Sequence, residues 1–143
     1  MKQEFTEDTW PSLRWPNFAF KELACSHSRE CFIDPEMMDH LQAVRDQYGR
    51  GMSITSGYRD ATHPIEVAKT DADGNPRPGA HYTGKAIDIA VRGGDAYRVL
   101  ALALAEGFTG IGVSQKGGNR FLHLDMIEPD DNFHVPRPSI WSY

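Results

Sequence analysis

Three residues with good metal-binding side chains, His81, Asp88 and His123, are the feature that most constrains how this 143-residue chain can fold. Asp88 lies in a strand-like segment, 86–91, and His123 in another, 120–126. Because successive side chains of a strand point to opposite faces, both groups are predicted to lie opposite the apolar residues of their strands. His81 lies in a glycine-containing turn. Two imidazoles and one carboxylate form a ligand set that zinc accepts while a fourth position stays open for water.

Two helices are predicted from capping residues and apolar spacing. The first follows Asp34-Pro35, because aspartate caps helix N-termini and proline fits the first helical position, and Gly49 ends it. The second covers 95–106. We expect its inner face to carry Leu100, Ala103 and Leu104.

The predicted strands alternate with the helices but form no clean βαβ repeat, which favours an α+β fold. We expect a single compact domain with a small, mostly antiparallel sheet flanked by helices. The predicted strands are 52–55, 86–91, 109–114 and 120–126.

The chain length suits one domain, 1–143, since one hydrophobic core can serve a chain of this size. Within it we distinguish an N-terminal arm (1–17), a core (18–126) and an irregular C-terminal tail (127–143). Trp10 and Trp15 of the arm are expected to pack on the body of the protein. The 60–80 loop and the two chain ends are expected to form the walls of a pocket.

Composition excludes several classes of function. The net charge of -5 and the isoelectric point near 5.6 argue against nucleic acid as a partner, because phosphate binding usually needs a basic face. No apolar run is long enough to span a membrane, and residues 1–10 do not resemble a secretory signal. We therefore expect synthesis in the cytoplasm without membrane insertion.

The two cysteines, Cys25 and Cys31, flank His27 and could suggest a small metal site. A fourth ligand is not evident and the spacing is not that of a Cys-x-x-Cys pair. A reduced pair or an incidental disulfide is the favoured interpretation.

Each of the three metal-ligand candidates, taken alone, is more often a residue that simply hydrogen-bonds. The ordered set around them is more specific, and it resembles the zinc D-alanyl-D-alanine carboxypeptidases. That family includes phage L-alanyl-D-glutamate endopeptidases used as endolysins, and hedgehog signalling domains share its fold. The resemblance covers about residues 18–126. Its motifs are Ser56-Gly57-Tyr58-Arg59, His81-x-x-Gly84-x-Ala86-x-Asp88, Gly110-Ile111-Gly112 and Phe121-Leu122-His123-Leu124-Asp125.

The resemblance implies zinc bound by the two histidines and Asp88. It also implies that Arg59 binds a carboxylate or carbonyl oxygen of the substrate, which suits the forked guanidinium group. Ser56 and Tyr58 are expected to contact substrate beside it. The alternative for Arg59 is a structural salt bridge.

One departure from the family pattern concerns the general base. The family commonly has an acidic residue or a histidine two or three positions before the last zinc histidine, where this chain has Phe121 and Arg120. Asp125 is the substitute candidate, and the alternative is that it orients His123. Weaker candidates are His63, Glu66 and His134.

The expected function is that of a zinc metallopeptidase that cuts the peptide stem of bacterial peptidoglycan, as a D,D-carboxypeptidase or an endopeptidase. A monomeric phage or prophage lysis enzyme, acting on the cell wall after release, fits the motifs best. Two alternatives are a non-catalytic, zinc-stabilised binding module of the same fold and a virion-associated wall-degrading enzyme.

Overall fold

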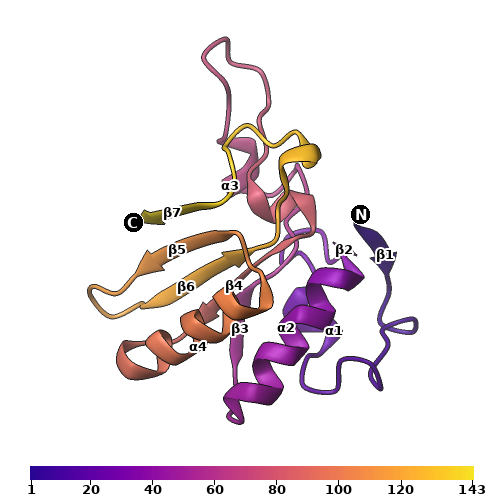
Figure 1. The fold of residues 1–143 in the computed structure, drawn as a ribbon. Coiled ribbons are helices and arrows are strands. Elements are labelled where there is room, and N and C mark those ends of the chain that lie inside the picture. Colours follow the sequence, from indigo (N-terminus) through magenta and orange to yellow (C-terminus); the bar gives the residue numbers. More distant parts are fainter.

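A five-stranded sheet, with strand order β3-β4-β6-β5-β7, organises the computed structural model, which describes all 143 residues (Figure 1). Three of its four strand pairs are antiparallel and only β5–β7 is parallel. The predicted α+β class and mostly antiparallel sheet are therefore confirmed. The strands are β3 (Ser53–Ser56), β4 (Ala86–Ala90), β5 (Gly110–Ser114), β6 (Phe121–Asp125) and β7 (Ser139–Ser142).

Two 14-residue helices, α2 (Pro35–Tyr48) and α4 (Gly93–Glu106), pack against each other on one face of the sheet (Figure 1). Asp34 caps α2 by accepting a hydrogen bond from the Glu36 backbone N–H at 2.9 Å. None of the helices combines the length and the apolar character that a membrane crossing requires. The short helical turns are α1 (Phe20–Leu23), η1 (Ala80–Thr83), α3 (Pro64–Val67) and η2 (Pro129–Asp131).

The inner face of α4 agrees only in part with the prediction, since Leu100 is only partly buried and Ala96 and Val99 were not predicted. Its buried side chains are Ala96, Val99 and Ala103, whose spacing of three and four keeps them on one side of the helix. Leu104 follows one residue, or about 100°, further round the helix axis. Its side chain is 56% exposed, so its placement in the core was wrong.

Alternation along β4 and β6 separates the hydrophobic core from the polar face, as predicted. Ile87 and Ile89 of β4 and Leu122 and Leu124 of β6 are at most 1% exposed and belong to the core. The opposite face carries the polar residues of the same strands. Its polar members are Asp88, His123 and Asp125.

The N-terminal arm packs on the body. Its β1 (Gln3–Phe5) pairs antiparallel with β2 (Cys31–Ile33), a strand that was not predicted. Trp10 is 8% exposed and Trp15 is fully buried, which confirms their expected packing. The thiols of Cys25 and Cys31 are buried and free, so the structure contains no disulfide.

The C-terminal tail is not irregular throughout, which corrects the prediction for 127–143. Residues Ser139–Ser142 form β7, an edge strand parallel to β5. Trp141 lies opposite Gly112, where a Cβ atom would come within 2.7 Å of the indole nitrogen. The tail pairs here because β5 has no side chain at that position to block the tryptophan.

We expect Gly57→Ala to lower the free energy of unfolding by about 1–3 kcal/mol, because the added Cβ would lie 2.7 Å from the Leu23 Cα. Backbone atoms cannot rotate away as a side-chain end can. Urea denaturation measures the change. Gly51→Ala is the matched control, since no atom lies within 4 Å of its Cβ position. Equal stability of the two variants would contradict the packing assigned to Gly57.

Candidate metal centre

The polar face of the sheet brings His81, Asp88 and His123 together. Asp88 and His123 are directly opposite each other in the β4–β6 ladder, and His81 reaches them from η1. The Asp88 Oδ1 atom is 3.2 Å from His81 Nε2 and 3.1 Å from His123 Nδ1. One ligand atom from each residue lies within 4.8 Å of the other two. The three predicted metal ligands therefore form one cluster.

His81 is held by the turn that precedes β4. Its Nδ1 lies 2.7 Å from the carbonyl oxygen of Gly57, and because a carbonyl can only accept, Nδ1 carries the proton. Nε2 is then the atom with a free lone pair, and it faces Asp88. Gly84 ends η1 with a positive φ of 75°, which lets the chain turn sharply from His81 into β4.

His123 is held by a buried ion pair. Its Nε2 donates to Asp125 Oδ2 at 2.8 Å, so Nδ1 is the nitrogen that faces Asp88. Arg137 donates from Nε and Nη2 to the two oxygens of Asp125, at 2.9 and 2.8 Å. Gly110, opposite Asp125 in the ladder, leaves the space that this carboxylate fills, because a Cβ there would overlap it.

The charge states follow from these contacts. Burial opposes ionisation of Asp88, but the hydrogen bond from His123 and the short contact with His81 outweigh it and hold the pKa of Asp88 well below the ordinary value. Burial lowers the pKa of His81, which keeps its imidazole neutral. Burial also opposes protonation of His123, but Asp125 and Asp88 raise its pKa overall. A metal at this site would therefore compete with a proton on His123.

The donor set fits a tetrahedral zinc-like ion. Ligand atoms at about 2.0–2.1 Å from zinc lie roughly 3.3 Å apart, close to the two distances from Asp88 Oδ1. Each histidine has its second nitrogen on a fixed acceptor, which is the usual arrangement behind metal-binding imidazoles. The residues present therefore suit a divalent metal with three protein ligands.

The cluster opens into a pocket of about 570 Å³. One wall comes from the 60–80 loop, through Ile65 and Lys69, and the other from the C-terminal tail. The N-terminal arm does not line it, so the expectation that both chain ends form the walls holds only for the C-terminal end. The tail residues in the wall are Phe133, His134, Val135, Arg137, Ser139, Trp141 and Tyr143.

Of the three residues expected to bind substrate, only Arg59 lines this pocket. Its guanidinium lies 3.7 Å from both Asp88 Oδ2 and Glu66 Oε2, which leaves it loosely paired beside the cluster. Tyr58 is instead 4% exposed, with its ring packed against Phe32, and its backbone N–H donates to the Leu23 carbonyl. Ser56 is half-buried and does not line the pocket.

Asp125 is fully buried, and both of its oxygens are engaged by Arg137 and His123. Burial opposes its ionisation, but these hydrogen bonds hold its pKa below the ordinary value. A carboxylate so enclosed cannot reach a water molecule in the pocket. The geometry therefore favours its role in orienting His123 over that of a base.

The structure distinguishes the three weaker candidates for the general base by whether they line the pocket. His63 caps α3, where its Nδ1 accepts a hydrogen bond from the Ile65 N–H, and it does not line the pocket. Glu66 is buried and binds Lys69 and the Gly79 N–H at 2.8 Å each. His134 alone of the three lines the pocket, from an exposed stretch of the tail.

The tail was expected to form part of the pocket wall, but the contacts that Arg137 and Trp141 make at the site were not predicted. Arg137 lies between the rings of Phe133 and Trp141, with its guanidinium carbon 5.2 Å from each ring centroid. The Trp141 ring is also 5.1 Å from that of His123.

The comparisons with known proteins agree with this geometry. Neither the search of curated proteins nor that of solved structures returned a match. The family model described as Peptidase M15 matches residues 16–125, which include all three residues of the cluster. The chain therefore belongs to the peptidase M15 family.

Proposed function

We propose that this protein is a zinc metallopeptidase that hydrolyses an amide bond in the peptide stem of bacterial peptidoglycan. The observation that carries the proposal is the convergence of three ligand atoms at a pocket, in a chain of the peptidase M15 family. When bound, zinc polarises a carbonyl group and lowers the pKa of water to about 7. The open side of the cluster faces the pocket, where an extended peptide has room to lie.

Arg59 is the proposed substrate-binding group. It lines the pocket next to Asp88, and its two ion-pair distances of 3.7 Å are longer than direct hydrogen bonds. Its N–H groups are therefore available for a carboxylate or carbonyl oxygen of the substrate. Asp125 and Arg137 act through His123, whose ring they fix.

His134 is the proposed proton carrier. Partial burial, together with Arg77, Arg137 and Lys69, lowers its pKa below the ordinary histidine value. Its imidazole is therefore neutral near pH 7 and able to accept a proton from water and deliver it to the leaving nitrogen. The exposed segment that carries it, next to η2, can adjust when substrate binds.

The biological role that we propose is cell-wall lysis by a phage or prophage enzyme, acting as a monomer on the wall after release. The support is the resemblance of the motifs to those of endolysin peptidases. A virion-associated enzyme would use the same chemistry during entry. The acidic net charge of -5 is also consistent with a partner other than nucleic acid.

A second candidate function is a zinc-stabilised binding module without turnover. The observation that favours it is the identity of the residues before His123, since neither Phe121 nor Arg120 can serve as a base. In that case the pocket would retain a stem peptide intact.

Digestion of purified muropeptides, followed by mass spectrometry, separates the two functions. The proposal predicts fragments with a new amine end in the presence of zinc, and none after chelation. Intact muropeptides that co-elute with the zinc-loaded protein would instead support the binding module.

We expect Asp125→Asn to weaken zinc binding about 10- to 100-fold, because a neutral amide orients His123 less strongly. Saturating zinc should then restore much of the cleavage rate. Metal titration and the rate at high zinc measure both effects. Asp131→Asn, which removes a carboxylate paired with Lys85 at 2.7 Å, is the matched control. Unchanged zinc affinity with lost cleavage would assign Asp125 the base role instead.

We expect His134→Gln to lower the turnover number about 10²- to 10⁴-fold, the usual contribution of a positioned acid–base group. Zinc content and melting temperature should stay at wild-type values, since His134 is exposed and outside the cluster. The matched control is His40→Gln, on α2, where the imidazole binds Glu106. An unchanged turnover number would remove His134 from the mechanism.

A further inference from the structure

A second pocket, of about 440 Å³, lies on the polar face of the sheet beside the metal centre. Phe121 lines both pockets, so the two adjoin across one side chain. The second pocket lies over the ends of β4 and β6 that are farther from the 60–80 loop. Its polar lining residues are Thr55, Arg92, Asn119 and Arg120.

The two arginines of this pocket have no acidic partner. Arg92 donates from Nη2 to the Gly118 carbonyl at 3.0 Å, and Arg120 donates from Nε to the Gly117 carbonyl at 3.1 Å. Neither forms a salt bridge, and no acidic residue lines the pocket. A guanidinium group has five N–H donors, so most of them remain unused in both residues.

The other cations around the metal centre differ in this respect. Each of them pairs with at least one buried carboxylate: Arg59 with Glu66 and Asp88, Lys69 with Glu66, and Arg137 with Asp125. These paired cations are Arg59, Lys69 and Arg137. Because the chain as a whole is acidic, two guanidinium groups without an acidic partner at one place are a local feature that the overall composition does not explain.

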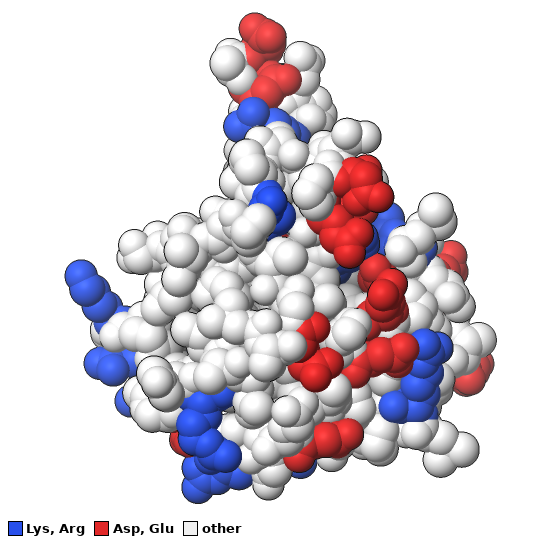
Figure 2. Space-filling model, viewed as in Figure 1, with Lys and Arg blue, Asp and Glu red and all other residues white.

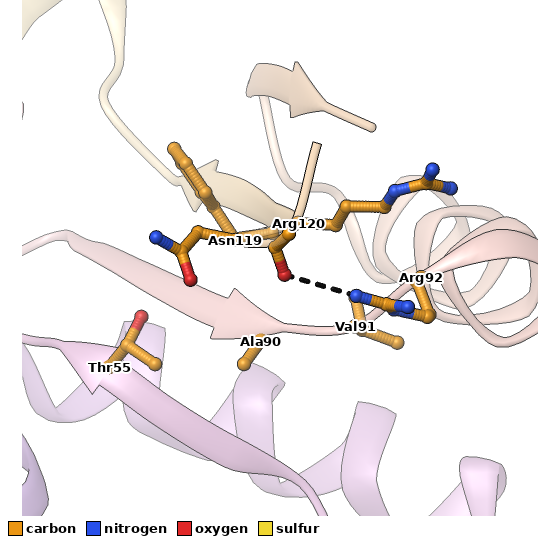
Figure 3. Close-up of a pocket in the computed structure, with 8 residues that line it drawn as sticks. Thr55, Ala90, Val91, Arg92, Asn119 and Arg120 are labelled. Atoms are coloured by element: carbon orange, nitrogen blue, oxygen red, sulfur yellow. Dashed lines mark hydrogen bonds between the residues drawn. The ribbon is translucent and has the colours of Figure 1, made fainter. Parts of the chain in front are cut away.

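Figure 3 shows how the polar groups lie. The guanidinium groups of Arg92 and Arg120 extend toward the side where α4 begins, and the Asn119 amide and Thr55 hydroxyl lie at the other side. Figure 2 shows basic side chains at the edge of the molecule where Figure 1 places the β5–β6 turn and the start of α4. This edge thus offers positive charge and hydrogen-bond donors together.

The separation of the two pockets is set by the strands. Ala90 lies two residues beyond Asp88 on β4, and Arg92 lies four beyond it. At about 3.3 Å per residue, the second pocket begins roughly 7 Å from the metal ligands and extends to about 13 Å. An extended peptide advances by a similar length per residue, so this span equals two to four peptide residues.

We propose that this second pocket is a substrate subsite that binds a free carboxylate, two to four residues from the bond cut at the metal centre. The inference rests on the proposed peptidase function and names its substrate class, an acidic peptide. Guanidinium groups bind carboxylates with charge-assisted hydrogen bonds. The subsite adds a second place for a substrate carboxylate, beside the one proposed at Arg59, whose own acidic partners lie 3.7 Å away.

The test uses two synthetic stem peptides of one sequence, one with free side-chain carboxylates and one with the same groups as carboxamides. Calorimetric titration into zinc-loaded protein gives the affinity of each, and mass spectrometry of the same mixtures reports cleavage. Wild-type protein is expected to bind the carboxylate peptide about 10-fold more tightly, as two charge-assisted contacts at a partly exposed site allow.

The double variant R92Q/R120Q should lose this preference, while K116Q, which removes a charge from the tip of the same turn but does not line the pocket, should keep it. If the double variant only disturbed the turn, its affinity for both peptides would fall by the same factor. A lost preference therefore reports on the subsite itself. The proposal would be overturned if the double variant preferred the carboxylate peptide as strongly as the wild type does, or if the wild type showed no preference. If the protein prefers the carboxylate peptide but does not cleave it, the peptidase function is rejected and the subsite is kept. If it cleaves both peptides without a binding preference, the subsite is rejected and the peptidase function is kept.

Discussion

The metal centre depends on one buried ion pair, between Asp125 and Arg137. The carboxylate fixes the ring of His123 from behind, and the guanidinium belongs to the C-terminal tail. Removing one partner of such a pair leaves a buried charge, which typically costs about 3–5 kcal/mol. A single interaction therefore orients a metal ligand and fastens the segment that forms one wall of the pocket. Stability of the tail and geometry of the site are coupled for this reason.

Strand register provides the rest of the site. The partners Asp88–His123 and Gly110–Asp125 stand on one face of the sheet, and the apolar residues between them form the core on the other. The same packing that stabilises the fold thus holds the ligands in place. Gly110 and Gly112 keep this face open where Asp125 and Trp141 need the space.

Much of this arrangement was predictable from sequence, because alternation in β4 and β6 is strong and the caps of α2 are clear. The strand in the tail was not predictable from sequence. It has only four residues and follows several prolines, so it gives little periodic signal, and it forms only because it pairs with β5. Tyr58 lies next to Arg59 in sequence but is buried against Phe32, a tertiary contact that the sequence motif does not reveal. The role of Asp125 required its partner Arg137, twelve residues away, whose contact no local pattern reveals.

The most direct test of the account is the zinc content of freshly purified, unchelated protein, measured together with its melting temperature. One zinc ion per chain is expected, and saturating zinc added after chelation should raise the melting temperature by several degrees, because binding at 100 times Kd contributes about 3 kcal/mol. His123→Ala should lose both the ion and the shift. Protein without the metal, whose melting temperature does not respond to added zinc, would contradict the account.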